Sequence, residues 1–553
     1  SFGVLKLSKY NQGVGAAANT NFGMQAGEDL TTGNHNVLIG NQAGLNLTDA
    51  DENVIIGDGA GQTSTGVHYA VLIGRGAAQN GNITTGANGV VAIGYTALEA
   101  LTSGIANTAV GYQALKEEDD GDYNTAIGYE VFNKQTGTSG TTANSGLGYR
   151  AGYYNTTGVK NTYIGYHSGF GVSGNPNSSN SALGYRSLVG ITTGTVNTAM
   201  GESAGASATT ASGSVFLGAD AGGTVTTGNQ NIAIGYDAMK GGTTTGDNNI
   251  AIGVSAGDAI TSAKRTVFIG LNAGGATQTG DDNVAIGGNA FKSGTNANSN
   301  VILGFNAADT TVTGDRLVII GAGAGRGVID NDGQGTVAIG YAAYNVGTGG
   351  QGNVAIGYEA LSVEDDGDLN TAVGYQALKD QVGVSGTVAN TALGYYAGTN
   401  ITTGIKNTML GAYAGYTSLL VDNTVLLGYN AGGGAAMTSD ADGTVAVGWS
   451  ALAQLTSGQR NIAIGYEALD ALKVGDDNIA LGYKALTNLG TSTFANRNIA
   501  IGTYALTSAA NNNMSDNIAI GYGALSQSVH SDGDSSVAIG TNAMSDLTAG
   551  AWG

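Results

Sequence analysis

The chain has 553 residues, of which 96 are glycine, one is proline and none is cysteine, and its formal net charge is −21. The lack of cysteine excludes disulfides, cysteine-ligated zinc and thiol catalysis. The acidic charge argues against nucleic acid and anionic membranes as partners, since both attract Lys and Arg. Hydrophobic residues make up 41% of the chain, more than disordered Gly-rich segments carry, so we expect a folded core.

A short repeat dominates the sequence. Residues 1–18 precede it and are interpreted as a lead-in or partial coil. From residue 19 to residue 553 the unit Asn-(Val/Ile/Thr)-Ala-(Ile/Leu/Val)-Gly-Tyr-x-Ala-Leu recurs, and its first glycine, here called the anchor glycine, occurs 30 times between Gly23 and Gly540. The spacing is 17 to 20 residues, and the extra residues fall in polar segments such as Gln135–Thr142 and Gly490–Phe494. Constant strands with variable loops predict an all-β, parallel β-solenoid (β-roll) of about 30 coils.

Each position of the unit predicts a structural role. The residue before the anchor is apolar in all 30 units, and the residue three before it is usually β-branched, as expected of a strand. The residue four before the anchor is Asn in about two-thirds of the units, which predicts a ladder of hydrogen-bonded amides. The anchor glycine itself permits a tight bend or a close backbone approach. Thr-Thr-Gly runs such as Thr226–Gly228 are typical of turns.

Two positions of the unit vary in size together. Where the residue two before the anchor is Ala, the residue four after it is large in 15 of 18 units, as in the pair Ala355 and Leu361. Where the first is large, the second is Gly or Ala in all ten units, as in Phe268 and Gly274. Close-packed interiors conserve volume, so we expect the two side chains to share one packed layer.

The strand is apolar or small on both faces. Side chains alternate along a strand, and one face can fill the lumen of the coil. The other needs a second surface, because strands that are apolar on both faces are buried on both. Further copies of the chain would supply it, so we expect a homo-oligomer.

The sequence also contains a longer repeat that spans several of the short units. The spacings of the anchors from Gly94 to Gly165 return from Gly340 to Gly411, at an offset of 246 residues. The acidic loop Glu118–Asp122 returns as Glu364–Asp368. We interpret residues 94–165 and 340–411 as duplicated blocks of coils.

The repeats resemble those of known fibrous proteins. Asn353–Gly357 (Asn-Val-Ala-Ile-Gly) is similar to the head repeats of trimeric autotransporter adhesins of the YadA type. The longer form at Asn370–Leu378 resembles still more closely the repeats of phage tail-fibre and appendage proteins. The resemblance implies a left-handed parallel β-roll assembled as a homotrimer. The period of 17 to 20 residues is longer than that of the adhesin heads, and no heptad stalk or membrane anchor is visible in the sequence.

Several segments have a functional and a plain structural interpretation. The acidic loops 117–122 and 364–368 offer clustered oxygen ligands for Ca²⁺, but they match neither calcium-loop motif, and solvated turns are expected. Gly321–Gly327 lacks the Gly-Lys-Ser/Thr ending of a phosphate loop. The four histidines share no metal-ligand spacing and are expected to be isolated; they are His35, His68, His167 and His530.

The tyrosine after the anchor recurs in half the units, which favours packing over stacking on glycans. The variable loops Gly137–Asn144 and Gly171–Asn180 are the better receptor candidates. Carboxylates in variable loops do not form the acid pair of a glycosidase. We therefore predict no catalytic, cofactor-binding or metal-binding residues and no enzymatic activity.

Taken together, these patterns predict a structural and adhesive fibre, a phage tail or virion fibre that projects a host-receptor-binding tip. Its expected partners are two further copies of itself and a glycan or protein on the host surface, with no nucleic acid and no membrane insertion by this segment. The expected location is the virion or the cell exterior. A trimeric bacterial surface adhesin head and a polysaccharide-depolymerising tailspike are the two alternatives.

Overall fold

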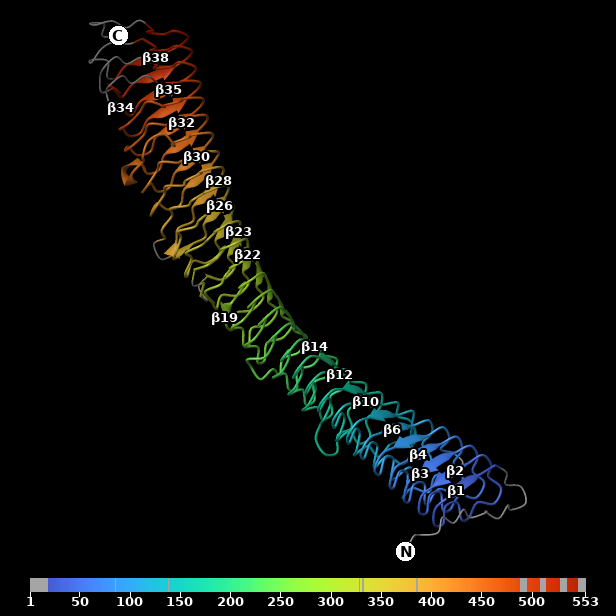
Figure 1. The fold of residues 1–553 in the computed structure, drawn as a ribbon. Helices are drawn as coiled ribbons and strands as arrows, with labels where there is room; N and C mark the ends of the chain where they lie inside the picture. The colour runs from blue at the N-terminus through green and yellow to red at the C-terminus, as the bar shows by residue number, and fades with distance from the viewer. Residues whose placement is uncertain are drawn as a thin grey trace. The chain divides into compact units, whose positions relative to one another are not determined.

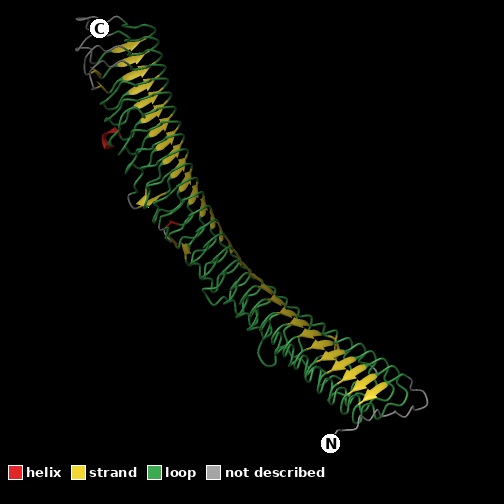
Figure 2. Cartoon of the chain, viewed as in Figure 1, coloured by secondary structure: helices red, strands yellow, loops and turns green. Residues whose placement is uncertain are grey.

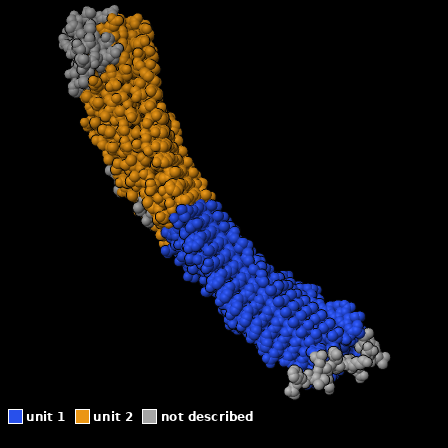
Figure 3. Space-filling view, viewed as in Figure 1, with its two compact units in different colours: residues 1–279 blue, residues 280–553 orange. Residues whose placement is uncertain are grey.

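The structure, a computed structural model, describes residues 18–84, 86–137, 139–327, 329–330, 333–383, 386–487, 495–507, 514–527 and 535–545. Residues 1–17 of the expected lead-in, the polar segment Gly490–Phe494 and His530 lie outside these ranges. The described chain is all-β, and the 3₁₀-helix η2 (Ser439–Ala441) is the one helix among its elements. It is divided into two compact units, residues 1–279 and 280–553 (Figure 3).

Each unit is a parallel β-solenoid, in which the coils contribute one three-residue strand each to the main sheet and most of the remaining chain is turn and loop (Figure 2). In the described part of the first unit, three-residue strands stack in a single sheet (Figure 1). These strands are β1 (Thr20–Phe22), β2 (Val37–Ile39), β3 (Val54–Ile56), β4 (Val71–Ile73), β5 (Val91–Ile93), β6 (Thr108–Val110), β8 (Thr125–Ile127), β10 (Ser145–Leu147), β11 (Thr162–Ile164), β12 (Ser181–Leu183), β13 (Thr198–Met200), β14 (Val215–Leu217), β15 (Ile232–Ile234), β16 (Ile250–Ile252) and β17 (Val267–Ile269). A second, two-residue pairing joins β7 (Gly121–Asp122) to β9 (Gly140–Thr141).

The described part of the second unit repeats this architecture. Its sheet contains β18 (Val284–Ile286), β20 (Val301–Leu303), β22 (Val318–Ile320), β23 (Val337–Ile339), β24 (Val354–Ile356), β26 (Thr371–Val373), β28 (Thr391–Leu393), β29 (Thr408–Leu410), β30 (Val425–Leu427), β31 (Val445–Val447), β32 (Ile462–Ile464), β33 (Ile479–Leu481), β35 (Ile499–Ile501), β37 (Ile518–Ile520) and β38 (Val537–Ile539). Minor two-residue strands pair beside it: β19 (Ser293–Gly294) with β21 (Thr311–Val312), β25 (Gly367–Asp368) with β27 (Gly386–Thr387), and β34 (Ala495–Asn496) with β36 (Met514–Ser515).

The duplicated blocks fold alike. The strands β6 to β11 of the first block and β24 to β29 of the second occupy residues that differ by 246, including the minor pairs β7–β9 and β25–β27. The duplication inferred from the acidic loops is therefore also a duplication of backbone structure.

The anchor glycines explain how closely the coils approach one another. Each follows directly after a three-residue strand, and Gly111 has a φ of +143°. A Cβ on Gly428 would come within 2.4 Å of the carbonyl oxygen of Gly448 in the next coil. The position therefore admits no side chain, and it requires a backbone conformation that L-residues rarely adopt.

The core confirms that the two covarying positions share one layer. The middle residue of the strand points inward, and Ala355 and Leu361 are both fully buried. In the reversed pair, a Cβ on Gly274 would meet the ring of Phe268. The two positions together fill one cross-section of the coil, as close packing requires.

Three coils depart from this size rule, because they have Ala two residues before the anchor and Gly four residues after it. Their glycines are Gly205, Gly257 and Gly398. A Cβ on Gly205 would touch the ring of Phe216, which belongs to the following coil. Phe268 and Met409 lie in the same way beside Gly257 and Gly398. Volume is therefore conserved across neighbouring coils as well as within one.

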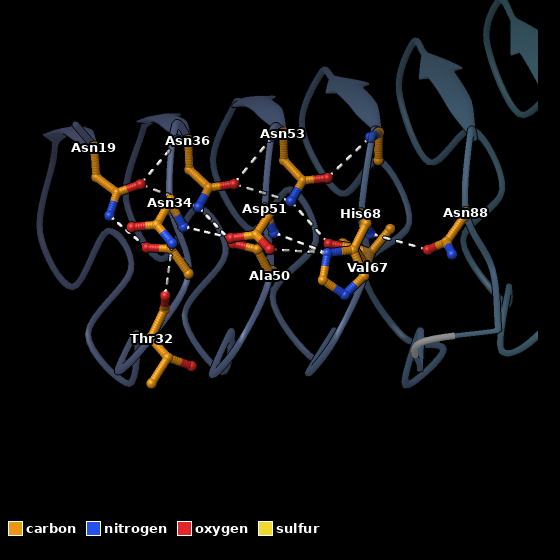
Figure 4. Close-up of polar contacts among 12 residues, drawn as sticks. Asn19, Thr32, Asn34, Asn36, Ala50, Asp51, Asn53, Val67, His68 and Asn88 are labelled. Atoms are coloured by element: carbon orange, nitrogen blue, oxygen red, sulfur yellow. Dashed lines mark hydrogen bonds and ion pairs between the residues drawn. The ribbon is translucent and has the colours of Figure 1, made fainter. Parts of the chain in front are cut away.

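The predicted asparagine ladder is present (Figure 4). The backbone N–H of Asn36 donates to Asn19 Oδ1 at 2.8 Å, and that of Asn53 donates to Asn36 Oδ1 at 3.0 Å. The side-chain Nδ2 of Asn36 also donates to the backbone carbonyl of Ala50, 14 residues further along the chain, at 2.6 Å. Asn36 and Asn53 are fully buried, so the ladder satisfies polar groups that have no access to water.

A second ladder, not foreseen from the sequence, runs along the turns. The N–H of Asn34 donates to Asp51 Oδ1, that of Asp51 to His68 Nδ1, and that of His68 to Asn88 Oδ1 (Figure 4). Each side chain thus accepts a hydrogen bond from the turn backbone of the preceding coil. This ladder therefore connects the turns of neighbouring coils in addition to the pairing of the strands.

Candidate functional site

The outward-facing side of the strands carries partly exposed apolar side chains along each unit. In most of the three-residue strands the middle residue is buried, and the residues on either side of it are half-buried or exposed. In β15, Ala233 faces the core and the outward positions are Ile232 and Ile234. Leu217 and Leu410, on the same outer face of other coils, are 41% exposed. The outermost of these positions, the residue before each anchor glycine, forms an apolar row that is only partly covered in the single chain.

A column of stacked tyrosines lies beside this surface, at the residue after each anchor. From Tyr95 to Tyr185, successive ring centroids are 4.8 to 5.2 Å apart and the rings are within 13° of parallel. Tyr112 and Tyr129 are each 40% exposed. A second column begins at Tyr341, and a third contains Trp449, Tyr466 and Tyr483.

This stacking determines what the columns can recognise. An inner ring such as Tyr112 has a neighbouring tyrosine on both faces, so its edge and hydroxyl remain for a partner. Sugars stack on the face of an aromatic ring, and here those faces are covered. The columns therefore favour packing against another surface over stacking on glycans.

The acidic loops contain a buried carboxylate rather than a fully solvated turn. Glu118 and Glu364 are completely buried. Glu118 accepts hydrogen bonds from the N–H of Gly121 at 2.7 Å and from Gln135 Nε2 at 2.6 Å. Glu364 accepts from the N–H of Gly367 at 2.8 Å. The expectation of solvated turns is wrong for these two side chains.

The protonation of both glutamates is shifted by their surroundings. Burial raises the pKa of Glu118, and the neighbouring carboxylates of Asp119 and Asp120 add to that rise. Burial likewise raises the pKa of Glu364 to about 7. Ligand atoms of Glu118, Asp119 and Asp120 lie within 4.8 Å of one another, but both Glu118 oxygens already accept hydrogen bonds from the protein. We therefore assign a structural role to this cluster.

The remaining sequence candidates are dispersed. His35 and His68 lie on turns, while His167 lies among aromatic rings, 4.1 Å from the centroid of Tyr166. Gly321–Gly327 follows strand β22 and forms a coil turn like the others. These described residues do not come together in one site.

The two loops considered as receptor candidates are only partly exposed. In Gly171–Asn180, the segment 172–174 is exposed, but Asn175 is buried and donates to the carbonyl of Ile191 at 2.7 Å. In Gly137–Asn144, whose residue 138 is not described, Asn144 is buried and donates to the carbonyl of Gly158 at 2.8 Å. The asparagines Asn144 and Asn175 of these two loops therefore belong to the core.

Comparison with known proteins gives no relative. No protein-family model matches the chain, and no curated protein matches it. Within the described ranges, the structure contains no helix with the length and apolar character that crossing a membrane requires.

Proposed function

We propose that the chain forms a homotrimeric structural and adhesive fibre, the rod of a phage tail or virion fibre that carries a host-binding tip. The observation that carries this proposal is the apolar outer face of the strands. It recurs at the same positions in coil after coil and remains half-exposed in the single chain. Leaving such a row in water costs roughly 25 cal/mol for each Å² that a partner would cover.

A further copy of the same chain is the simplest partner for this face. The last residue of each strand is apolar in every coil, and the first is Val, Ile, Thr or Ser, so a second solenoid would meet the same row of positions in matching register. The tyrosine columns beside the face offer ring edges and hydroxyls to such a neighbour. The resemblance of Asn353–Gly357 and Asn370–Leu378 to repeats of trimeric fibres favours three copies.

Mechanically, the coil architecture suits a rod. Within each unit, parallel strands connect neighbouring coils, and side-chain ladders add hydrogen bonds between many of them. A closed coil leaves no lateral strand edge for uncontrolled pairing. A stiff fibre of this kind would hold a receptor-binding end away from the particle.

The native mass tests the assembly directly. Sedimentation equilibrium or native mass spectrometry should give three times the chain mass of 54.7 kDa. A folded monomer at micromolar concentration would refute the trimer. Immunogold labelling of purified virions with an antibody against the chain should decorate fibres, and labelling of bacterial cell surfaces alone would contradict the virion assignment.

A further inference from the structure

A column of ionisable side chains, two of them arginines, runs beside the tyrosines in one part of the first unit. The residues two after the anchor in consecutive coils are Glu130, Arg150, His167 and Arg186. The backbone N–H of each of the last three donates to the tyrosine carbonyl of the preceding coil at 2.8 to 2.9 Å. Their φ angles are +53°, +54° and +55°. The backbone therefore holds all three in the same conformation, one coil apart.

Aromatic rings form walls on both sides of this column. The guanidinium of Arg150 lies 5.2 Å from the ring centroids of both Tyr149 and Tyr153. The His167 ring lies 4.1 Å from Tyr166 on one side and 4.5 Å from Phe170 on the other. Such contacts orient the cations and remove part of their hydration.

The charges of this column are incompletely neutralised. Arg150 pairs through Nε with Glu130, whereas Arg186 is exposed and makes no ion pair with the residues that the structure describes. The Nε2 atom of His167 is buried without a hydrogen-bond partner among them. Burial lowers the pKa of His167, and the positive charges of Arg150 and Arg186 lower it further. Arg186 thus leaves an uncompensated positive charge in this column, on a chain whose net charge is −21.

The spacing suits one acid group. Arg150 and Arg186 are two coils apart, so their backbones are separated by roughly 10 Å. A carboxylate held between two guanidinium groups lies about 4 Å from each guanidinium carbon. We propose that Arg150, His167 and Arg186 form a binding site for a carboxylated saccharide, with the guanidinium groups binding the acid and the edges and hydroxyls of the flanking tyrosines, rather than their covered faces, contacting the sugar.

The chain contains its own control for this site. At the equivalent positions of the second unit, Tyr396 and Tyr413 lie 246 residues after Arg150 and His167, and Asn430, two residues after the anchor Gly428, lies 244 residues after Arg186. Their φ angles of +57°, +60° and +56° show the same backbone conformation. Exchanging the cations for these residues therefore removes the charge while keeping side chains that this backbone already accommodates.

The experiment measures binding of tetragalacturonate to the full-length protein in its native assembly by calorimetry at low ionic strength. We expect binding that weakens with salt and is at least about tenfold tighter than that of neutral cellotetraose, which corresponds to about 1.4 kcal/mol. The double variant R150Y/R186N should lose at least about tenfold, while the surface variant R316N should bind as the parent does. Unchanged circular dichroism verifies that the variants fold.

A second readout is independent of affinity. A bound carboxylate would offset the two guanidinium charges, so the titration of the His167 imidazole, followed by NMR, should move to higher pH when tetragalacturonate is added. The proposal is overturned if tetragalacturonate binds no better than cellotetraose, if R150Y/R186N binds it as well as the parent, or if the His167 titration does not move at saturation.

Discussion

Phe268 fills the space that a side chain at position 274 would occupy: a Cβ built on Gly274 would lie 2.5 Å from two carbons of the Phe268 ring. The two residues are six apart in sequence, and they form one layer of the coil interior. The distance shows why a large residue two before the anchor requires a small residue four after it.

A double-mutant cycle tests this layer. Phe268→Ala should destabilise the coil by about 3–5 kcal/mol through the cavity that it leaves, and Gly274→Leu should cost about 1–3 kcal/mol or more through overpacking. The combined variant has the Ala-and-large pairing of most other coils, so it should be more stable than the sum of the two changes predicts. Hydrogen exchange of the β17 amides measures the local stability, and simple additivity would show that the residues do not share a layer.

The asparagine ladder gives a second prediction. Asn478 Oδ1 accepts from the N–H and the Nδ2 of Asn498, and its own Nδ2 donates to the carbonyl of Ala495 at 2.7 Å. Asn478→Leu leaves these buried groups unpaired, at about 1–3 kcal/mol each. Urea unfolding should therefore begin at this coil.

Asn478→Thr is the matched control for the ladder. Thr266 occupies the equivalent position in another coil, where its hydroxyl donates to Asn249 Oδ1 at 2.9 Å. The threonine variant should lose less stability than the leucine variant. Equal losses would indicate that side-chain volume, rather than hydrogen bonding, determines this position.

The buried Glu364 predicts a pH dependence. Its pKa rises from an ordinary value of 4.5 to about 7 in the folded state, so the folded protein binds a proton that the unfolded chain releases. Its contribution to stability is complete below about pH 4.5 and is lost as the pH rises to about 7. The exchange rate of the Gly367 amide, which donates to this carboxyl, should report the loss.

Glu364→Gln separates this group from all others that titrate. The amide keeps an acceptor for Gly367 and cannot ionise, so the variant should show a flatter pH profile for that amide between pH 4.5 and 7. If the parent and the variant show the same profile, the buried carboxyl is not the source.

The outer face of the strands predicts which substitutions would dissociate the proposed trimer. Replacing Ile232 and Ile234 of β15 by lysine places two charges where the proposed trimer excludes water, and an unpaired buried charge is strongly unfavourable. The native mass should fall towards that of one chain while circular dichroism still shows β-structure. Thr243→Lys, at an exposed position of a nearby turn, should leave the mass unchanged, and a mass unaffected by the isoleucine changes would place the interface elsewhere.

The sequence contained most of the repeating core. The strand positions, the anchor glycines, the asparagine ladder and the pairing of Ala355 with Leu361 all follow from residues whose roles admit few substitutes. The turn ladder was missed because Asp51, His68 and Asn88 differ in identity: any side-chain acceptor of suitable length meets the need, so no sequence pattern arises.

The candidate sites were harder to foresee because they depend on neighbours in space. Glu118 is buried beneath Gln135 of the following coil, and charge alone suggested an exposed turn. Arg150, His167 and Arg186 are 17 to 19 residues apart in sequence and form a column only once the coils are stacked. Their shared offset from the anchor glycine was the signal that could have revealed them.

The way in which the anchor glycines set the coil boundary has a consequence for evolution and engineering. Since each coil begins and ends at equivalent backbone positions, excision of the residues from Gly201 to the one before Gly218 would bring matching ends together. The length of the solenoid would then change by about 4.8 Å for each coil that is added to or removed from the gene. Recombination within the repeats, as between the blocks at 94–165 and 340–411, could adjust the reach of the fibre without inventing a new fold.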